Sequence, residues 1–400
     1  MQDHKGLKLN FTKILQFDSS LVIIKKLQES GYQAVFAGGS VRDIINLRSD
    51  IENIDIDIAT SALPEEVEKL FPHTVAVGKA FGVIRVIIKH QSLEVATFRK
   101  DGPYKDGRRP ETVNFVGIKE DAQRRDFTVN ALFYDPIQDV LYDFVDGLAD
   151  LKNKTLRAVG DPFLRFQEDE LRRLRLIRFV SQLGFEIEAE TWKAMKQDIG
   201  GIKKVSPERI TDEIYKLWKG QDLKKAFQLF WQSGMAEVLN PGLVKPYLND
   251  FEHVSKGNIW LHYFFVMYGF QDSQKRLTQF KLSSEIQKNI LKAQAYYQKV
   301  DQFLDLKFSQ QRLDWNDPTK AWVVNTVLNQ NPKWISLKEK LNEMGPLPQP
   351  LLNGHDLKDH FQGADLGRAL EKLYLLQLEQ GWSDRQQAFE YLNLRFKVNT

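Results

Sequence analysis

The stretch from Val35 to Thr60 places the strongest constraint on how this chain can fold. From Asn53 onward it alternates aspartate with isoleucine, reading Asp55, Ile, Asp57, Ile. A β-strand sends alternate side chains to opposite faces. The pattern therefore predicts a strand with both aspartates on one face and the isoleucines on the other, which should face the core.

Two carboxylates at positions i and i+2 of a strand lie roughly 6–7 Å apart at the backbone. At an effective dielectric of about 20, their mutual repulsion is roughly 2–3 kcal/mol. A fold tolerates such a pair on a solvated face, or where a divalent cation bridges it. The pair alone leaves both interpretations open.

The residues before this strand favour the cation. Gln33 to Ala37 reads as a strand, Gly38 and Gly39 as a tight turn, and Ser40 as the N-cap of a helix. Such a turn lets the backbone approach phosphate groups closely, with free N–H groups pointing at them. Arg42, in the first helical turn, adds a charged fork. A phosphate-binding turn beside a carboxylate pair is far more specific than either feature alone.

Composition limits what can be argued for the whole chain. Its 400 residues, 42% hydrophobic and 27% charged, leave room for two or more domains. The formal net charge is only +3, so a nucleic-acid partner must be argued from local clusters. Cysteine is absent, which excludes disulfides and thiolate metal sites. With neither a membrane-length apolar run nor a signal-peptide pattern, we expect a cytoplasmic protein without membrane association.

A second dense group of charges lies between residues 168 and 179, in the part of the chain that reads as helical. Asp169, Arg172, Arg175 and Arg178 follow one another at intervals of three. On one helix they would form a stripe that winds slowly round it. The pattern is also typical of a solvated, salt-bridged helix. One acid and several arginines along one face would suit a nucleotide, with its base at one end and its phosphates at the other.

These motifs resemble those of a known family. Gly-Gly-x-Val-Arg-Asp from Gly38, followed by Asp55-x-Asp57, is similar to the class II tRNA nucleotidyltransferases (CCA-adding enzymes) of bacterial type. Those enzymes belong to the tRNA nucleotidyltransferase/poly(A) polymerase family, within the superfamily of DNA polymerase beta. Residues 124–131 (Arg-Arg-Asp-Phe-Thr-Val-Asn-Ala) resemble the family's nucleotide-binding motif. Residues 168–172 match its Glu-Asp-x-x-Arg motif in full.

The resemblance implies an α+β fold. An N-terminal nucleotidyltransferase head would contain a small mixed, polymerase-beta-like sheet, and an all-α neck, body and tail would follow. The expected boundaries are residues 1–154 for the catalytic head, 155–222 for the neck with the nucleotide-selecting motif, 223–305 for the body and 306–400 for a tRNA-binding tail.

The resemblance also implies a site. Asp55 and Asp57 would be the catalytic carboxylates and would bind Mg²⁺. The ATP- and CTP-binding residues would be Gly39, Arg42, Arg125, Asp169, Arg172, Arg175 and Arg178.

Asp169 and Arg172 would read the edge of the base. A carboxylate accepts from an exocyclic amine and a guanidinium donates to a ring nitrogen, and both C and A present these two groups. U and G present the wrong groups, and such a bidentate match is worth roughly 1–3 kcal/mol of discrimination.

The reaction implied is template-independent addition of C, C and A to the 3′ end of tRNA, with release of pyrophosphate. The enzyme would hold the tRNA by its 3′ end and acceptor arm. Residues 100–110 are similar to the family's mobile loop, which assists the change from C to A addition and is missing from CC-only enzymes.

Three other functions share part of this sequence pattern. Poly(A) polymerase and an A-adding-only enzyme stay open, although the sequence Gly78-Lys-Ala-Phe-Gly82 is closer to the CCA-adding form. The intact pair Asp55 and Asp57 argues against a catalytically inactive RNA-binding protein. The sequence leaves open whether the chain is a homodimer and whether Glu94 joins the metal site.

Overall fold

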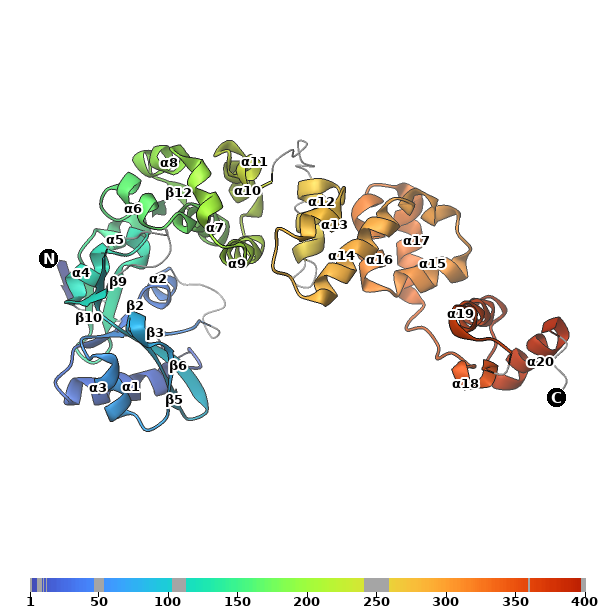
Figure 1. Ribbon diagram of the computed structural model, residues 1–400, viewed down its shortest axis with the longest axis horizontal. Coiled ribbons are helices and arrows are strands. Elements are labelled where there is room, and N and C mark those ends of the chain that lie inside the picture. Colours follow the sequence, from blue (N-terminus) through green and yellow to red (C-terminus); the bar gives the residue numbers. More distant parts are fainter. Residues whose placement is uncertain are drawn as a thin grey trace. The chain divides into compact units, whose positions relative to one another are not determined.

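The computed structural model describes residues 2–5, 9, 11, 13–46, 54–102, 113–240, 259–358 and 360–396. The chain forms two compact units, Met1–Leu243 and Val244–Thr400 (Figure 1). The finer division into head, neck, body and tail stays a prediction. Residues 103–112, most of the predicted mobile loop, lie outside the described residues.

The first unit is built on an eight-stranded mixed sheet with the order β1-β10-β9-β2-β3-β6-β5-β4. Its strands are β1 (Gln2–Lys5), β2 (Ala34–Ala37), β3 (Asp57–Thr60), β4 (Thr74–Gly78), β5 (Val83–Ile88), β6 (Gln91–Thr97), β9 (Leu132–Asp135) and β10 (Val140–Asp143). Strands β3 and β6 pair in parallel, whereas the other pairings are antiparallel. The predicted mixed sheet is confirmed.

The central strands β2 and β3 are covered on both faces. Phe36 lies on one face, where its ring centroid is 6.3 Å from that of Phe17 at the start of α1 (Phe17–Glu29). Ala59 lies on the other face, in an apolar cluster with Ala122 of α4 (Ile118–Gln123). Asp57 alternates with the buried Ile58 and so projects on the same side as Ala59. This places Asp57 at one end of the sheet face that α4 covers.

The alternation predicted for residues 54–58 is confirmed in burial. The isoleucines at 54, 56 and 58 are 8%, 2% and 1% exposed, whereas Asp55 and Asp57 are exposed. The regular strand begins only at Asp57, so the prediction that Asp55 lies within it is wrong. The side chain of Gln16 supplies the physical reason. Its Oε1 accepts from the backbone N–H of Ile56 at 3.0 Å, where a neighbouring strand would otherwise bind.

The turn before α2 (Gly39–Ile45) depends on Gly38. Gly38 is the N-cap and has φ +69°, a conformation that favours glycine. A Cβ at this position would lie 2.7 Å from Nη1 of Arg125. The predicted N-cap, Ser40, is wrong, because Ser40 lies inside the helix and donates to the carbonyl of Ala37 at 3.2 Å. The absence of a side chain at Gly38 therefore leaves room for an arginine.

The remainder of the first unit is mainly helical, as predicted. Its other helices are α3 (Pro64–Leu70), α5 (Gly147–Lys152), α6 (Pro162–Glu168), α7 (Leu171–Leu183), α8 (Ala189–Lys196), α9 (Pro207–Trp218), α10 (Leu223–Gln232) and α11 (Met235–Leu239). Its 3₁₀ helices are η2 (Lys79–Phe81), η3 (Thr128–Asn130) and η4 (Ile199–Lys204). Two small sheets pair β7 (Arg99–Asp101) with β8 (Val113–Phe115) and β11 (Thr155–Leu156) with β12 (Glu186–Ile187). Helix α7 buries Leu174, Ile177 and Val180 completely and packs against α9 and α10.

In the second unit, all the regular secondary structure of the described residues is helical. The helices are α12 (Ile259–Tyr268), α13 (Ser273–Leu277), α14 (Ser284–Tyr297), η5 (Val300–Asp305), α15 (Phe308–Trp315), α16 (Pro318–Val327), α17 (Pro332–Glu343), α18 (Gly354–Leu357), α19 (Gly363–Gln380) and α20 (Arg385–Phe396). Helix α12 is buried along its whole length, including Tyr263 and Phe264. The aromatic side chains of α12 are core residues, as expected from the sequence. Among the described helices, none has the length and apolar character needed to cross a membrane.

Candidate active site

A pocket of about 580 Å³ in the first unit brings together the sheet, α2, α7 and α9. It is lined by Gly38, Gly39, Arg42, Asp57, Arg99, Arg124, Arg125, Asp126, Asn130, Asp169, Arg172, Arg175, Arg178, Phe179 and Arg209. Eight arginines face three aspartates, so the pocket is strongly positive and suits a polyanion. Every residue predicted to bind nucleotide lines this pocket, and so does Asp57. Asp55 is not among the lining residues.

Asp57 is the carboxylate with the least neutralised surroundings. Its neighbour on β6 is Glu94, which is paired with it in register. Desolvation raises the pKa of Asp57 to about 6, and the charges of Glu94 and Asp55 add to this effect while Arg125 opposes it. Among the described residues, none forms a hydrogen bond or ion pair with the Asp57 carboxylate. A carboxylate that is crowded by like charges and lacks a bonded partner is a suitable ligand for a divalent cation.

The donor set near Asp57 is small. Nowhere in the described part of the chain do three or more His, Asp or Glu side chains group so as to hold a metal ion. Glu94 forms an ion pair with Arg85, with Nη2 and Oε1 2.7 Å apart, so it is already partnered. Asp55 accepts from Nε2 of Gln16 at 3.4 Å. Two carboxylates fit Mg²⁺, which commonly takes one or two from a protein and completes its shell with water and substrate phosphates.

Asn130 holds two of the predicted nucleotide-binding arginines. Nη1 of Arg42 donates to Oδ1 of Asn130, and Nε donates to Asp43 at 2.7 Å. Nη1 of Arg125 donates to the backbone carbonyl of Asn130 at 3.1 Å. The Arg125 guanidinium also lies 4.6 Å from the ring centroid of Phe133. The two guanidinium groups are therefore oriented before any ligand binds.

Ion pairs continue from this group to α7 and α9. Oδ2 of Asp126 accepts from Nε and Nη2 of Arg175 at 2.8 and 2.6 Å. Burial alone would raise the pKa of Asp126, but Arg175 and Asn130 hold it well below its usual range. Arg178 lies 2.6 Å from Glu213 of α9 and 3.9 Å from the ring centroid of Phe179. Burial lowers the pKa of Arg178 to about 10, although Glu213 opposes that change.

Asp169 does not lie on the same helix as the arginines, which corrects the sequence prediction. It is the C-cap of α6, with extended backbone, and α7 begins at Leu171. Its carboxylate accepts from the N–H of Leu171 at 3.1 Å and from two nitrogens of Arg209 at 3.2 and 2.7 Å. Sequence reasoning missed Arg209 because its approach to Asp169 depends on how α9 packs against α7.

Arg172 is held by three acceptors. Its Nη1 donates to the carbonyl of Arg165 at 2.8 Å and to Oε2 of Glu168 at 2.5 Å. Its Nη2 donates to the carbonyl of Arg124 at 3.2 Å. Glu168 is the last residue of α6, so its ion pair with Arg172 spans the break between α6 and α7. Arg172 is largely buried and lines the same pocket as Asp169.

Phe179 is another lining residue that the sequence did not reveal. The guanidinium carbons of Arg178, Arg42 and Arg175 lie 3.9, 5.2 and 5.5 Å from its ring centroid. A phenylalanine one position after an arginine on a helix ordinarily reads as a core residue. Arg42 reaches the ring from α2, a helix far from Phe179 in the sequence.

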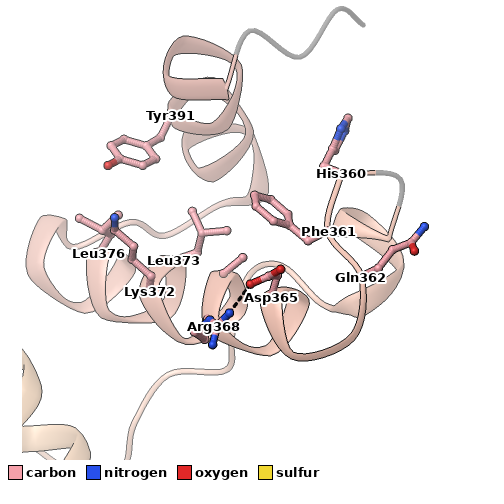
Figure 2. A pocket seen from close by; sticks show the side chains of 10 residues that line it. His360, Phe361, Gln362, Asp365, Arg368, Lys372, Leu373, Leu376 and Tyr391 are labelled. Atoms are coloured by element: carbon pink, nitrogen blue, oxygen red, sulfur yellow. Dashed lines mark hydrogen bonds and ion pairs between the residues drawn. The ribbon is translucent and has the colours of Figure 1, made fainter.

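A second cavity, of about 590 Å³, lies in the second unit between α19, α20 and residues 360–362 (Figure 2). Leu373 and Tyr391 belong to its apolar lining, and Arg368 is paired with Asp365 at its rim. Its lining holds neither a free carboxylate pair nor a group of arginines. The chemistry indicated by the sequence is therefore located in the first unit.

A mixed sheet that presents an aspartate to an arginine-lined pocket is typical of a head domain of the polymerase class, and helices α7 and α9 complete the lining of this pocket. Residues 34–157 match the poly A polymerase head domain, and residues 184–245 match the probable RNA and SrmB-binding site of polymerase A. The chain resembles the CCA-adding enzymes in particular, so the resemblance predicted from the sequence is confirmed. Enzymes of this family are in general metal-dependent.

Two curated relatives carry the sequence likeness. A CCA-adding enzyme of Staphylococcus aureus (strain bovine RF122 / ET3-1) is 46% identical over 213 residues, which are 53% of this chain and 52% of the relative. One from Lactobacillus johnsonii is 41% identical over 253 residues, which are 61% and 62% of the two chains. This chain thus spans about half to three fifths of the length of the curated relatives it matches.

Solved structures extend the likeness to nearly the whole chain. The Bacillus stearothermophilus CCA-adding enzyme in complex with CTP has a TM-score of 0.74 and 27% identity, covering 96% of this chain and 99% of that one. The Thermotoga maritima CCA-adding enzyme complexed with tRNA-CCA shares the fold, with a TM-score of 0.71 at 19% identity and coverage of 99% and 100%. The predicted α+β fold class is confirmed.

Proposed function

We propose that this chain is a CCA tRNA nucleotidyltransferase that adds C, C and A to the 3′ end of tRNA in the cytoplasm. CTP and ATP are its substrates and pyrophosphate is released. The observation that carries the proposal is the single pocket that joins Asp57, the guanidinium groups around Asn130, and the neighbouring pair Asp169 and Arg172. One ligand with phosphates, ribose and base can contact all three groups.

Asp55 and Asp57 hold Mg²⁺ in this proposal. A metal held there would supply a lower pKa for the terminal 3′-hydroxyl of tRNA and would offset the charge of the triphosphate. Arg42 and Arg125 bind the phosphates and ribose from orientations that Asn130 fixes. The turn at Gly38 leaves the space in which Arg125 lies.

Asp169 and Arg172 select the base. The Asp169 carboxylate accepts from N4 of cytosine or N6 of adenine, while Arg209 holds it in place. The three hydrogen bonds of Arg172 occupy three of its five N–H groups, which leaves donors for N3 of cytosine or N1 of adenine. UTP offers a carbonyl and a ring N–H at these positions, so both contacts are mismatched. The expected discrimination is roughly 1–3 kcal/mol.

The tRNA contributes its 3′ end and acceptor arm. Lysine and arginine side chains on the helical parts of the chain would contact the tRNA backbone, including those of the tail predicted for residues 306–400. Such contacts release counterions, so binding should weaken steeply as salt concentration rises.

The test is incubation with tRNA lacking the 3′ CCA, and with tRNA ending in C or in CC. Each labelled nucleotide is supplied singly and together, and the products are sequenced. CCA formed only when CTP and ATP are both present supports the proposal. A run of A from ATP alone would make the chain a poly(A) polymerase, and incorporation only onto tRNA ending in CC would make it an A-adding enzyme. Asp57→Asn serves as the control, since it should bind tRNA without extending it.

A further inference from the structure

Arg165 of α6 does not line the pocket, yet its guanidinium binds backbone carbonyls next to two arginines that do, Arg124 and Arg125. Its guanidinium donates from Nε to the carbonyl of Val159 at 3.0 Å, from Nη1 to that of Arg124 at 3.0 Å and from Nη2 to that of Gln123 at 2.6 Å. Gln123 is the last residue of α4 and Arg124 is its C-cap. Carbonyls at a helix C-terminus lack partners within the helix, and a cation there is favourable. Arg165 therefore caps α4 from another element.

The end of α4 carries two of the pocket's arginines. Arg124 and Arg125 follow directly after α4, and the carbonyl that Arg165 binds belongs to the peptide bond between them. That carbonyl also accepts from Nη2 of Arg172 at 3.2 Å. One oxygen is thus shared by Arg165 and by the arginine to which we assign base selection.

Glu168 is shared in the same way. Its Oε2 accepts from Nη1 of Arg165 at 2.8 Å and from Nη1 of Arg172 at 2.5 Å. Nη1 of Arg172 donates in addition to the backbone carbonyl of Arg165. All three acceptors that hold Arg172 are therefore either held by the Arg165 side chain or belong to Arg165 itself.

From this geometry we infer that Arg165 is a positioning residue for nucleotide selection, an inference that rests on the proposed function. It holds the guanidinium of Arg172 in one orientation relative to that of Arg125. The base and the phosphates of one nucleotide can then contact the two arginines at the same time. Base reading depends on such precision, because a loosely held group loses directional hydrogen bonds first. Lysine cannot replace Arg165 fully, since an ammonium lacks the planar fork that reaches several carbonyls at once.

The experiment measures kcat and KM of the full-length enzyme for CTP and UTP, on tRNA lacking CCA, alongside thermal melting. Arg165→Ala should lower the ratio of kcat/KM for CTP over UTP about tenfold, within the range of a bidentate contact. Arg165→Lys should keep the melting temperature near that of the wild type and still lower the ratio several-fold, which keeps the test open if the alanine variant folds poorly. Arg157→Ala is the matched control. Arg157 pairs with Asp150 and Glu188 outside the pocket, so its loss should leave the ratio unchanged.

A double variant separates positioning from mere stability. If Arg165 acts through Arg172, adding Arg165→Ala to Arg172→Ala should lower selectivity no further. Full additivity of the two effects would overturn the inference, as would lower melting temperatures in both Arg165 variants with an unchanged CTP/UTP ratio. A wild-type enzyme that fails to incorporate CTP would overturn the proposed function and this inference together. A selective wild type with equally selective Arg165 variants overturns this inference alone.

Discussion

Among the single residues of the site, Asp57 carries a charge that its neighbours do not neutralise. Its pKa of about 6 lies above the value of about 3.9 in an unfolded chain. The folded protein therefore binds the proton more tightly, and stability falls as pH rises from about 4 to about 6. Asp57→Asn removes this penalty. It should raise the stability of the metal-free protein at pH 8 by about 1 kcal/mol, a value reduced for solvent screening, and have little effect at pH 4.

Metal binding at Asp57 should also change the stability of the protein. A ligand that binds only the folded state raises its stability. Mg²⁺ should therefore raise the melting temperature of the wild type at pH 8, less so at pH 5 where Asp57 is protonated, and not that of Asp57→Asn. Differential scanning fluorimetry over a pH series measures both effects. An equal Mg²⁺ shift in the wild type and the variant would remove Asp57 from the metal site.

A further prediction at the residue scale concerns Arg172 and the selection of CTP over UTP. Arg172→Ala should lower the ratio of kcat/KM for CTP over UTP by about five- to a hundredfold, because one of the two contacts that UTP mismatches is removed. The rate with CTP should fall as well. Incorporation of all four nucleotides is measured beside thermal melting. A stable variant with the wild-type preference would show that Arg172 only braces α7 against the end of α4.

At the scale of elements, the contact between α5 and η3 tolerates no side chain at Gly147. A Cβ there would lie 2.2 Å from the carbonyl oxygen of Thr128, which is backbone and cannot move aside easily. Gly147→Ala should destabilise the protein by about 2–3 kcal/mol through overpacking. Gly200→Ala is the control in the same unit, since a Cβ at Gly200 meets nothing within 4 Å. Equal melting temperatures for the two variants would contradict the prediction.

Elements whose pattern is local could be predicted from the sequence. The alternation of isoleucine and aspartate indicated which side chains of residues 54–58 are buried, and the spacing of Arg172, Arg175 and Arg178 indicated the helix that is α7. Details set by distant side chains could not be predicted. Gln16 decides where β3 begins, and the break at Asp169 is stabilised by Arg209, forty positions later. Arg165 belongs to the same class, because its role depends on three carbonyls from other segments.

At the scale of the whole molecule, every described residue that lines the pocket belongs to the first unit. All its lining residues fall between Gly38 and Arg209, whereas the second unit begins at residue 244. A fragment ending at residue 243 should therefore bind CTP within about twofold of the full chain. Its affinity for tRNA should fall at least about tenfold, because the phosphate contacts proposed for the second unit would be lost and each would contribute to affinity.

Calorimetry with CTP and filter binding with tRNA at two salt concentrations measure the two affinities, after melting confirms that the fragment folds. The dependence of log K on log salt should be shallower for the fragment than for the full chain, since fewer counterions are released. Loss of CTP binding by a folded fragment would show that the second unit completes the nucleotide site. Unchanged tRNA affinity with an unchanged salt slope would place the whole RNA-binding surface in the first unit and leave the tail without the tRNA contacts predicted for it.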